Sequence, residues 1–164
     1  MNQLINQHIS EHRDVLAHLS NLEPQISSIA KILVSALKNK KTIFWCGNGG
    51  SASDSQHLAG ELVGRFVGDR KPLKSIALNA DSAVMTCIVN DYGYEHLFSR
   101  QVNALGAEGD VLIGITTSGK SKNVINAFHA ANQLHMTSIG LLGNDGGDAK
   151  DIIKESIIIP SKTT

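Results

Sequence analysis

The stretch Lys41–Glu61, KTIFWCGNGGSASDSQHLAGE, predicts the type of fold that the whole chain adopts. It begins with an apolar run, Thr42–Cys46, whose β-branched and aromatic residues predict a short buried strand. The residues Gly47–Gly50 interrupt this run, and from Ser51 onward apolar residues recur at helical spacing. The sequence therefore predicts a strand, a glycine loop and a helix.

Two interpretations of this unit remain open from its residues alone. Glycine permits a positive φ and a close approach of the backbone to a ligand, while a helix start offers unpaired N–H groups to a polar or anionic group. A purely structural turn is equally consistent, because the loop is neither a Walker A loop nor a GxGxxG fingerprint. The helix also carries His57 and Glu61 on one face, and this pair either holds a small molecule or a metal or only stabilises an exposed helix.

Bulk composition narrows the class of protein. A length of 164 residues suits one domain, and 41% hydrophobic residues, 18% charged residues and a formal net charge of zero are typical of an ordinary globular chain. We therefore expect no nucleic acid partner and no membrane association, since the chain also lacks an apolar run of membrane-spanning length. Cys46 and Cys87 have no CxxC spacing and no signal peptide precedes them, which predicts two reduced, buried thiols in the cytoplasm.

Helical and strand patterns alternate along most of the chain. Residues 1–40 predict two helices separated at Pro24, and the apolar stripe of the first has no evident partner within the chain, so we expect it to be buried against another subunit. The strands that follow are predicted at Thr42–Cys46, Lys74–Leu78, Asp110–Thr116, Thr137–Leu142 and Ser156–Pro160. A polar turn is predicted over residues 79–82 and a short helix over residues 148–154. Right-handed crossovers then give a single α/β domain over residues 1–164, with a five-stranded parallel sheet covered by helices on both faces in a flavodoxin-like three-layer sandwich.

Two further loops carry polar groups at the level where ligands bind such sheets. A helix predicted over residues 83–89 ends at Asn90-Asp91-Tyr92-Gly93, whose amide and carboxylate suit sugar hydroxyls, although an ordinary Asx turn fits equally well. The run Thr116-Thr117-Ser118-Gly119-Lys120-Ser121 joins a buried strand to a helix predicted over residues 122–134. Helix capping explains one or two of its hydroxyls, whereas four hydroxyls around a glycine favour a cradle for a phosphate monoester.

Three stretches of the sequence are informative together: CGNGGSASDSQHLAGEL at residues 46–62, IVNDYG at residues 88–93 and DVLIGITTSGKSKNV at residues 110–124. They resemble the phosphoheptose isomerases, the sedoheptulose 7-phosphate isomerase branch of the sugar isomerase (SIS) fold. The resemblance implies a cytoplasmic homotetramer whose sites are shared between subunits, with residues 1–40 used in oligomerisation. It also implies conversion of sedoheptulose 7-phosphate to D-glycero-D-manno-heptose 7-phosphate, a precursor of bacterial lipopolysaccharide or capsule.

The resemblance also implies roles for individual residues. Glu61 would be the catalytic base and, with His57, a ligand of one zinc ion per subunit. Substrate contacts would come from Glu61 and from Asn48, Gly49, Gly50, Ser51, Asn90, Asp91, Thr116, Thr117, Ser118 and Ser121, of which the last four would hold the phosphate. Arg65, one turn past Glu61, either offsets negative charge at the site or faces solvent.

Two departures from the family pattern stand out. Thr116 replaces a residue that is commonly Ser, which keeps the hydroxyl. The sequence ends at Pro160–Thr164, where the family begins a last helix carrying a Gln zinc ligand and a His that serves as ligand and general acid, so we expect two further ligands beyond Thr164. The rival interpretation is a non-catalytic SIS protein that binds phosphosugars to regulate transcription or associates with the replication initiator DnaA, because fold alone does not separate these classes.

Overall fold

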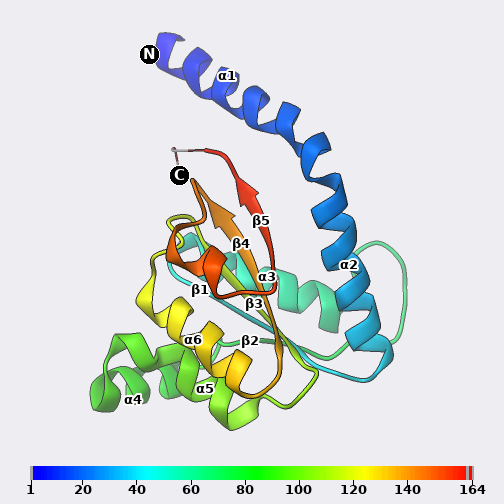
Figure 1. Cartoon of the computed structure of the whole chain (residues 1–164), viewed down its shortest axis with the longest axis vertical. Coiled ribbons are helices and arrows are strands. Elements are labelled where there is room, and N and C mark those ends of the chain that lie inside the picture. Colours follow the sequence, from blue (N-terminus) through cyan, green and yellow to red (C-terminus); the bar gives the residue numbers. More distant parts are fainter. Residues whose placement is uncertain (1, 162, 164) are drawn as a thin grey trace.

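A five-stranded, all-parallel sheet forms the centre of the molecule, in a computed structural model that describes residues 2–161 and 163 (Figure 1). The strands are β1 (Ile43–Gly47), β2 (Ser75–Ala77), β3 (Val111–Thr116), β4 (Thr137–Gly143) and β5 (Glu155–Ile159). Their order in the sheet is β2-β1-β3-β4-β5. The predicted fold class is confirmed, and each predicted strand is present with its ends shifted by no more than one residue.

Helices cover both faces of this sheet. They are α1 (Asn2–His18), η1 (Leu19–Leu22), α2 (Glu23–Lys38), α3 (Gly50–Val63), α4 (Ser82–Tyr92), η2 (Tyr94–His96), α5 (Leu97–Leu105), α6 (Lys122–Gln133) and η3 (Gly147–Asp151), where η marks a 3-10 helix. Helices α4, α5 and α6 lie on one side of the sheet, and α2 and α3 lie on the other (Figure 1). The result is the three-layer arrangement that the alternation of patterns predicts.

The two faces of the sheet bury separate sets of strand residues. Phe44 and Leu112 pack into the core under α5 and α6, whereas Trp45 and Ile113 pack into the core under α2 and α3. Successive strand residues point to opposite faces, so apolar strands covered on both sides form two cores. The indole N–H of Trp45 donates to the Ser75 hydroxyl oxygen at 2.9 Å, which ties β1 to β2.

Helix α6 packs unusually close to β3 because the strand carries a glycine beneath it. A Cβ atom at Gly114 would lie 2.8 Å from a methyl carbon of Val124 and would also run into the ring of Phe128. Both side chains are fully buried. This close packing fixes where the first turn of α6 lies relative to the end of β3.

Helix α1 extends away from the rest of the molecule (Figure 1). None of its described residues is buried, and Leu4, Ile5, Ile9 and Leu16 are each more than half exposed. Pro24 lies in the first turn of α2, after the 3-10 turn that separates the two helices. The apolar stripe of α1 therefore has no partner among the described residues, and its burial against another subunit stays a prediction.

Three details of the sequence prediction are wrong. Helix α4 continues to Tyr92, so Asn90 and Asp91 lie in its last turn rather than in a loop; it ends only at Gly93, whose φ of +89° favours glycine. Cys87 is exposed, because the buried side of α4 is formed around Ile88. The short helix predicted over residues 148–154 is instead η3, which ends at Asp151.

None of the helices described by the structure combines the length and apolar character needed to cross a lipid bilayer.

Candidate active site

The glycine loop between β1 and α3 keeps its backbone accessible. Gly49 has a φ of +58°, and a Cβ atom on Gly49 or Gly50 would meet nothing within 4 Å. Gly47 is crowded instead, because a Cβ there would lie 2.8 Å from the Ser51 carbonyl oxygen and 2.9 Å from that of Ile115. The loop thus turns tightly at Gly47 and presents an open main-chain surface where α3 starts.

Asn48 lies in this loop and is held by a network that sequence patterns did not reveal. Its Nδ2 donates to Asn123 Oδ1 at 3.0 Å, and Asn123 Nδ2 donates back to Asn48 Oδ1 at 2.9 Å. The Tyr94 hydroxyl donates to the same Asn48 oxygen at 2.8 Å. Three segments far apart in the chain therefore meet at one amide: the glycine loop, the start of α6 and the start of η2.

Asn79 supports the other side of the loop. Its Nδ2 donates to the Gly47 carbonyl oxygen at 2.8 Å, and its main-chain oxygen accepts from Gln56 Nε2 at 3.0 Å. The Asn79 side chain is buried, and its Oδ1 has no hydrogen-bond partner among the described residues. The sequence had indicated only a polar turn at this position.

The hydroxyl cluster from Thr116 to Ser121 follows β3, the strand next to β1 in the sheet. Thr116 is buried, and its hydroxyl oxygen lies 3.1 Å from that of Ser121, while Thr117 and Ser118 are exposed. Ser121 is the N-cap residue of α6, yet its side chain makes no capping hydrogen bond. Because the hydroxyls are not used to cap the helix, capping does not account for the cluster, and the anion-cradle interpretation gains support.

The turn at Gly146 and Gly147, which follows β4, packs against this cluster. Gly119 has a φ of +63°, and a Cβ atom there would overlap the Gly146 carbonyl oxygen. The main-chain N–H of Gly147 donates to the Asp145 carboxylate at 3.0 Å and holds the pKa of Asp145 below its usual value, with Lys150 and Lys120 lowering it further. Lys120, which belongs to the hydroxyl cluster in sequence, thus carries its positive charge close enough to Asp145 to act on that carboxylate.

His57 and Glu61 face each other on the outer side of α3. The His57 Nε2 and a carboxylate oxygen of Glu61 are 3.2 Å apart, and their side chains are 74% and 31% exposed. Arg65 is exposed beyond them, whereas Arg70 donates to the Leu62 carbonyl oxygen at 2.8 Å and so closes the end of α3. The predicted pair is therefore a real contact on the helix that leaves the glycine loop.

The pair has the donor types that zinc prefers, an imidazole nitrogen and a carboxylate oxygen. It supplies two of the four donors of a typical tetrahedral site. Over residues 2–161 and 163, no third histidine, cysteine or carboxylate completes a metal-binding group. Any further ligand would have to come from outside the described part of this chain.

The last turn of α4 carries an amide and a carboxylate shortly before Tyr94 in the chain. Asn90 Nδ2 donates to Asp91 Oδ1 at 2.7 Å, and both residues are exposed. The segment that follows them carries Tyr94, whose hydroxyl reaches Asn48. The structure thus connects the glycine loop with the α4 end and with α6, while no hydrogen bond in the described chain joins His57 or Glu61 to those groups.

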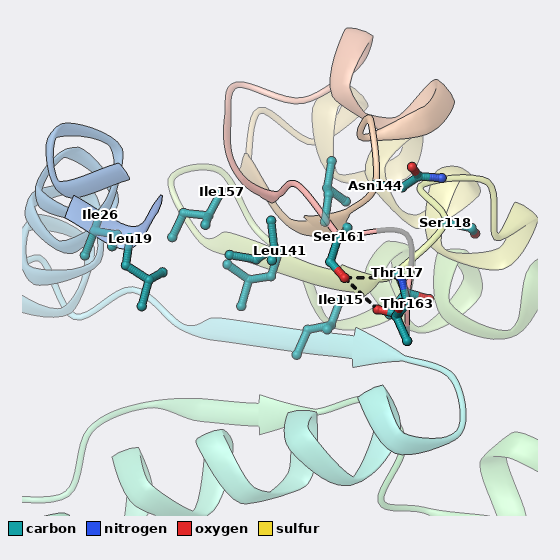
Figure 2. Close-up of a pocket in the computed structure, with 13 residues that line it drawn as sticks. Leu19, Ile26, Ile115, Thr117, Ser118, Leu141, Asn144, Ile157, Ser161 and Thr163 are labelled. Carbon is teal, nitrogen blue, oxygen red and sulfur yellow. Dashed lines mark hydrogen bonds between the residues drawn. The ribbon is translucent and has the colours of Figure 1, made fainter. Parts of the chain in front are cut away.

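A cavity of about 640 Å³ adjoins the hydroxyl cluster (Figure 2). Thr117 and Ser118 form one end of it, and the apolar side chains of Ile115, Leu141 and Ile157 form its floor. Such an apolar floor does not suit a phosphate or a sugar. The polar loops are therefore the better candidate site, and the cavity is a gap over the sheet face that Leu19 of η1 and Ile26 of α2 also line.

Comparison with known proteins decides the family. A phosphoheptose isomerase of Geobacter metallireducens is 46% identical to this chain over all of the chain and 87% of the relative's length. The chain belongs to the phosphoheptose isomerase family. A second member, the phosphoheptose isomerase of Helicobacter pylori strain 26695, is also 46% identical over all of the chain.

The profile of the SIS domain matches residues 7–143, which include the glycine loop, His57, Glu61 and the hydroxyl cluster. The solved structure of the phosphoheptose isomerase GmhA from Neisseria gonorrhoeae superposes with a TM-score of 0.93 at 38% identity, covering 99% of this chain and 88% of that one. The fold and the family inferred from the sequence are confirmed. The comparisons favour the isomerase over the regulatory class of SIS proteins.

Proposed function

We propose that the protein is an aldose–ketose isomerase that converts sedoheptulose 7-phosphate to D-glycero-D-manno-heptose 7-phosphate. The observation that carries this proposal is the position of Glu61. It lies on the helix that leaves the glycine loop, and the exposed hydroxyls of Thr117 and Ser118 follow the adjacent strand. A carboxylate base and an anion cradle on neighbouring loops suit a phosphorylated sugar.

The chemistry requires a proton to move between two adjacent carbons through a cis-enediolate. Glu61, only partly exposed, acts as the base that removes the proton from one carbon and returns it to the other. Asn48, Gly49, Gly50 and Ser51 bind the sugar from the glycine loop, and Asn90 and Asp91 bind its hydroxyls from the end of α4. These contacts fix the carbon chain relative to Glu61, which is the positioning part of catalysis.

The phosphate is held by Thr117, Ser118 and Ser121, with Lys120 adding positive charge nearby. Thr116 is buried and contacts Ser121, so its part is to set the Ser121 hydroxyl rather than to reach the ligand. Binding the phosphate far from the reacting carbons supplies energy that positions the sugar for proton transfer.

We further propose zinc as cofactor, held in part by His57 and Glu61. When bound, it would act as a Lewis acid that stabilises negative charge on the sugar oxygens. We also propose a cytoplasmic homotetramer in which a neighbouring subunit covers the stripe of α1. The product would feed the synthesis of bacterial lipopolysaccharide or capsule.

A coupled assay that follows ketose-to-aldose conversion of sedoheptulose 7-phosphate tests the proposal. We expect turnover by the wild-type protein that a strong zinc chelator abolishes and added zinc restores. A protein that binds the phosphosugar tightly but never converts it would instead support the regulatory class of SIS proteins.

A further inference from the structure

The reciprocal amide pair between Asn48 and Asn123 has a consequence for ligand binding. We propose that Asn123 is a positioning residue that orients the Asn48 amide, so that Asn48 offers one N–H donor and no acceptor to an oxygen of the bound phosphosugar. This inference rests on the proposed function, because it assumes that Asn48 contacts the sugar.

The orientation of Asn123 follows from a main-chain group that can only donate. The N–H of Val124 donates to Asn123 Oδ1 at 3.0 Å, so the oxygen of that amide is on the side of Val124. The Asn123 side chain is 2% exposed, which means that its amide cannot turn towards solvent. Its Nδ2 is therefore directed at the glycine loop.

The orientation of Asn48 then follows from that of Asn123. Asn123 Nδ2 requires an acceptor, which is Asn48 Oδ1 at 2.9 Å, and Asn123 Oδ1 requires a donor, which is Asn48 Nδ2 at 3.0 Å. The Tyr94 hydroxyl adds a second donor to Asn48 Oδ1 at 2.8 Å. One main-chain N–H in α6 thus determines which way round the amide lies in a loop 75 residues earlier.

A side-chain amide has two N–H donors and an oxygen that accepts two hydrogen bonds. The Asn48 oxygen already accepts from Asn123 and Tyr94, so its capacity is filled. Its nitrogen uses one hydrogen on Asn123, and the other has no partner among the described residues. Asn48 is only half-buried, so this remaining N–H can serve a ligand oxygen.

The pair also joins the two loops that the proposed substrate would bridge. Asn48 belongs to the loop that binds the sugar, and Asn123 lies two residues after Ser121, in the first turn of the helix behind the phosphate cradle. Loss of Asn123 should therefore act on substrate through Asn48 and leave the His57–Glu61 contact on α3 unchanged.

A double-mutant cycle tests the inference. Asn123→Ala should lower kcat/KM about tenfold, the expected effect of losing one oriented hydrogen bond. In an Asn48→Ala background the same substitution should change kcat/KM by less than about twofold, because the group through which it acts is gone. Asn126→Ala, which removes another α6 amide that donates to the Glu95 carbonyl oxygen, is the matched control and should leave kcat/KM unchanged in both backgrounds.

Asn123→Asp provides a second variant that keeps the shape and the acceptor for Val124, so it tests orientation even if Asn123→Ala does not fold. Its carboxylate would face the Asn48 oxygen and repel it, and kcat/KM should fall at least as far as in Asn123→Ala. Tyr94→Phe should have a smaller effect in the same direction.

Independent, multiplicative losses from Asn48→Ala and an Asn123 substitution, in an active wild-type protein, would overturn the inference and leave the proposed function standing. The inference would also be overturned if Asn48→Ala kept the wild-type kcat/KM while Glu61→Gln strongly lowered kcat/KM. A wild-type protein that neither converts nor binds sedoheptulose 7-phosphate would overturn both together.

Discussion

The hydroxyl oxygens of Thr116 and Ser121 lie 3.1 Å apart across the loop that joins β3 to α6. This contact closes the loop on itself and leaves Thr117 and Ser118 exposed between the two ends. It also separates two roles that look alike in the sequence. Thr116 is buried and shapes the loop. Ser118 is exposed, and although its oxygen accepts from the main-chain N–H of Lys120 at 3.1 Å, its own O–H can still donate to a ligand.

Ser118→Ala should therefore weaken binding of the phosphosugar. Loss of one charge-assisted hydrogen bond should cost about 1.5–3 kcal/mol of binding free energy, measured by calorimetry with sedoheptulose 7-phosphate. The unphosphorylated sugar is the control and should bind almost equally to the wild-type and variant proteins. Equal losses for both ligands would mean that the phosphate binds elsewhere.

Glu61→Gln should keep the size of the side chain and remove its basicity. We expect turnover to fall by about 10²-fold or more, because general base catalysis is lost, while calorimetry still detects substrate binding. Asp54→Asn removes an exposed carboxylate from the same helix and should retain wild-type turnover. Near-normal turnover in Glu61→Gln would exclude Glu61 as the base.

Gly119→Ala should destabilise the protein because both the space and the backbone conformation oppose a side chain there. The φ of +63° and the overlap of a Cβ with the Gly146 carbonyl should together lower the free energy of unfolding by about 3 kcal/mol. Gly60 is the opposite case, because it is exposed within a helix and a Cβ atom there would meet nothing within 4 Å. Gly60→Ala should therefore raise the free energy of unfolding by about 0.5–1 kcal/mol. Urea denaturation measures both, and a Gly119→Ala protein as stable as wild type would contradict the close packing of the two turns.

The paired substitution Leu16→Glu and Leu19→Glu should shift the protein towards monomer in sedimentation experiments. Both leucines are exposed, at 57% and 36%, on the apolar stripe at the end of α1 and the start of η1. Placing charges there would oppose burial of the stripe against another subunit. Gln3→Glu with Ser10→Glu adds the same charge on the opposite side of α1 and should leave the assembly intact. A wild-type protein that sediments as a fully active monomer at micromolar concentration would refute the oligomer.

The two cysteines should differ sharply in their reactivity towards a thiol reagent. Burial raises the pKa of the Cys46 thiol to about 12, so this residue should stay unlabelled in the folded protein, whereas the exposed Cys87 should react. Mass spectrometry of wild type and of Cys87→Ser checks this. The raised pKa also means that Cys46 favours folding below pH 9 and that this contribution is lost as the pH rises towards 12, since the unfolded thiol ionises first. Rapid labelling of native Cys87→Ser would show that Cys46 is accessible.

The fold could be predicted because its signals are local. Apolar runs such as Ile43–Cys46 and Val111–Ile115 separate cleanly from helical patterns, and each glycine loop marks a strand end. The prediction that Asn90 and Asp91 lie in a loop was wrong, because the sequence does not show that α4 continues up to Gly93, the glycine with a positive φ. The prediction that Cys87 is buried was wrong, because an apolar run in a short helix does not show which side of the helix faces the core.

The candidate site was predicted residue by residue, but its connections were not. The contacts of Asn48 with Asn123 and Tyr94 span 75 and 46 residues of sequence, and no periodicity links them. Asn79 looked like a turn residue, yet it holds the Gly47 carbonyl from inside the protein. Such contacts depend on how closely α6 packs against β3, which in turn depends on Gly114 and therefore on the assembled sheet.

Trp45, whose indole N–H is hydrogen-bonded to Ser75, is an intrinsic fluorescence probe. Trp45 is the only tryptophan in the chain, it is 6% exposed, and it lies two residues before the glycine loop. Its fluorescence should therefore come from a single environment, and a change in the loop on ligand binding would alter that emission directly. Stopped-flow measurements on the unlabelled protein could then separate the rate of sugar binding from the rate of its conversion.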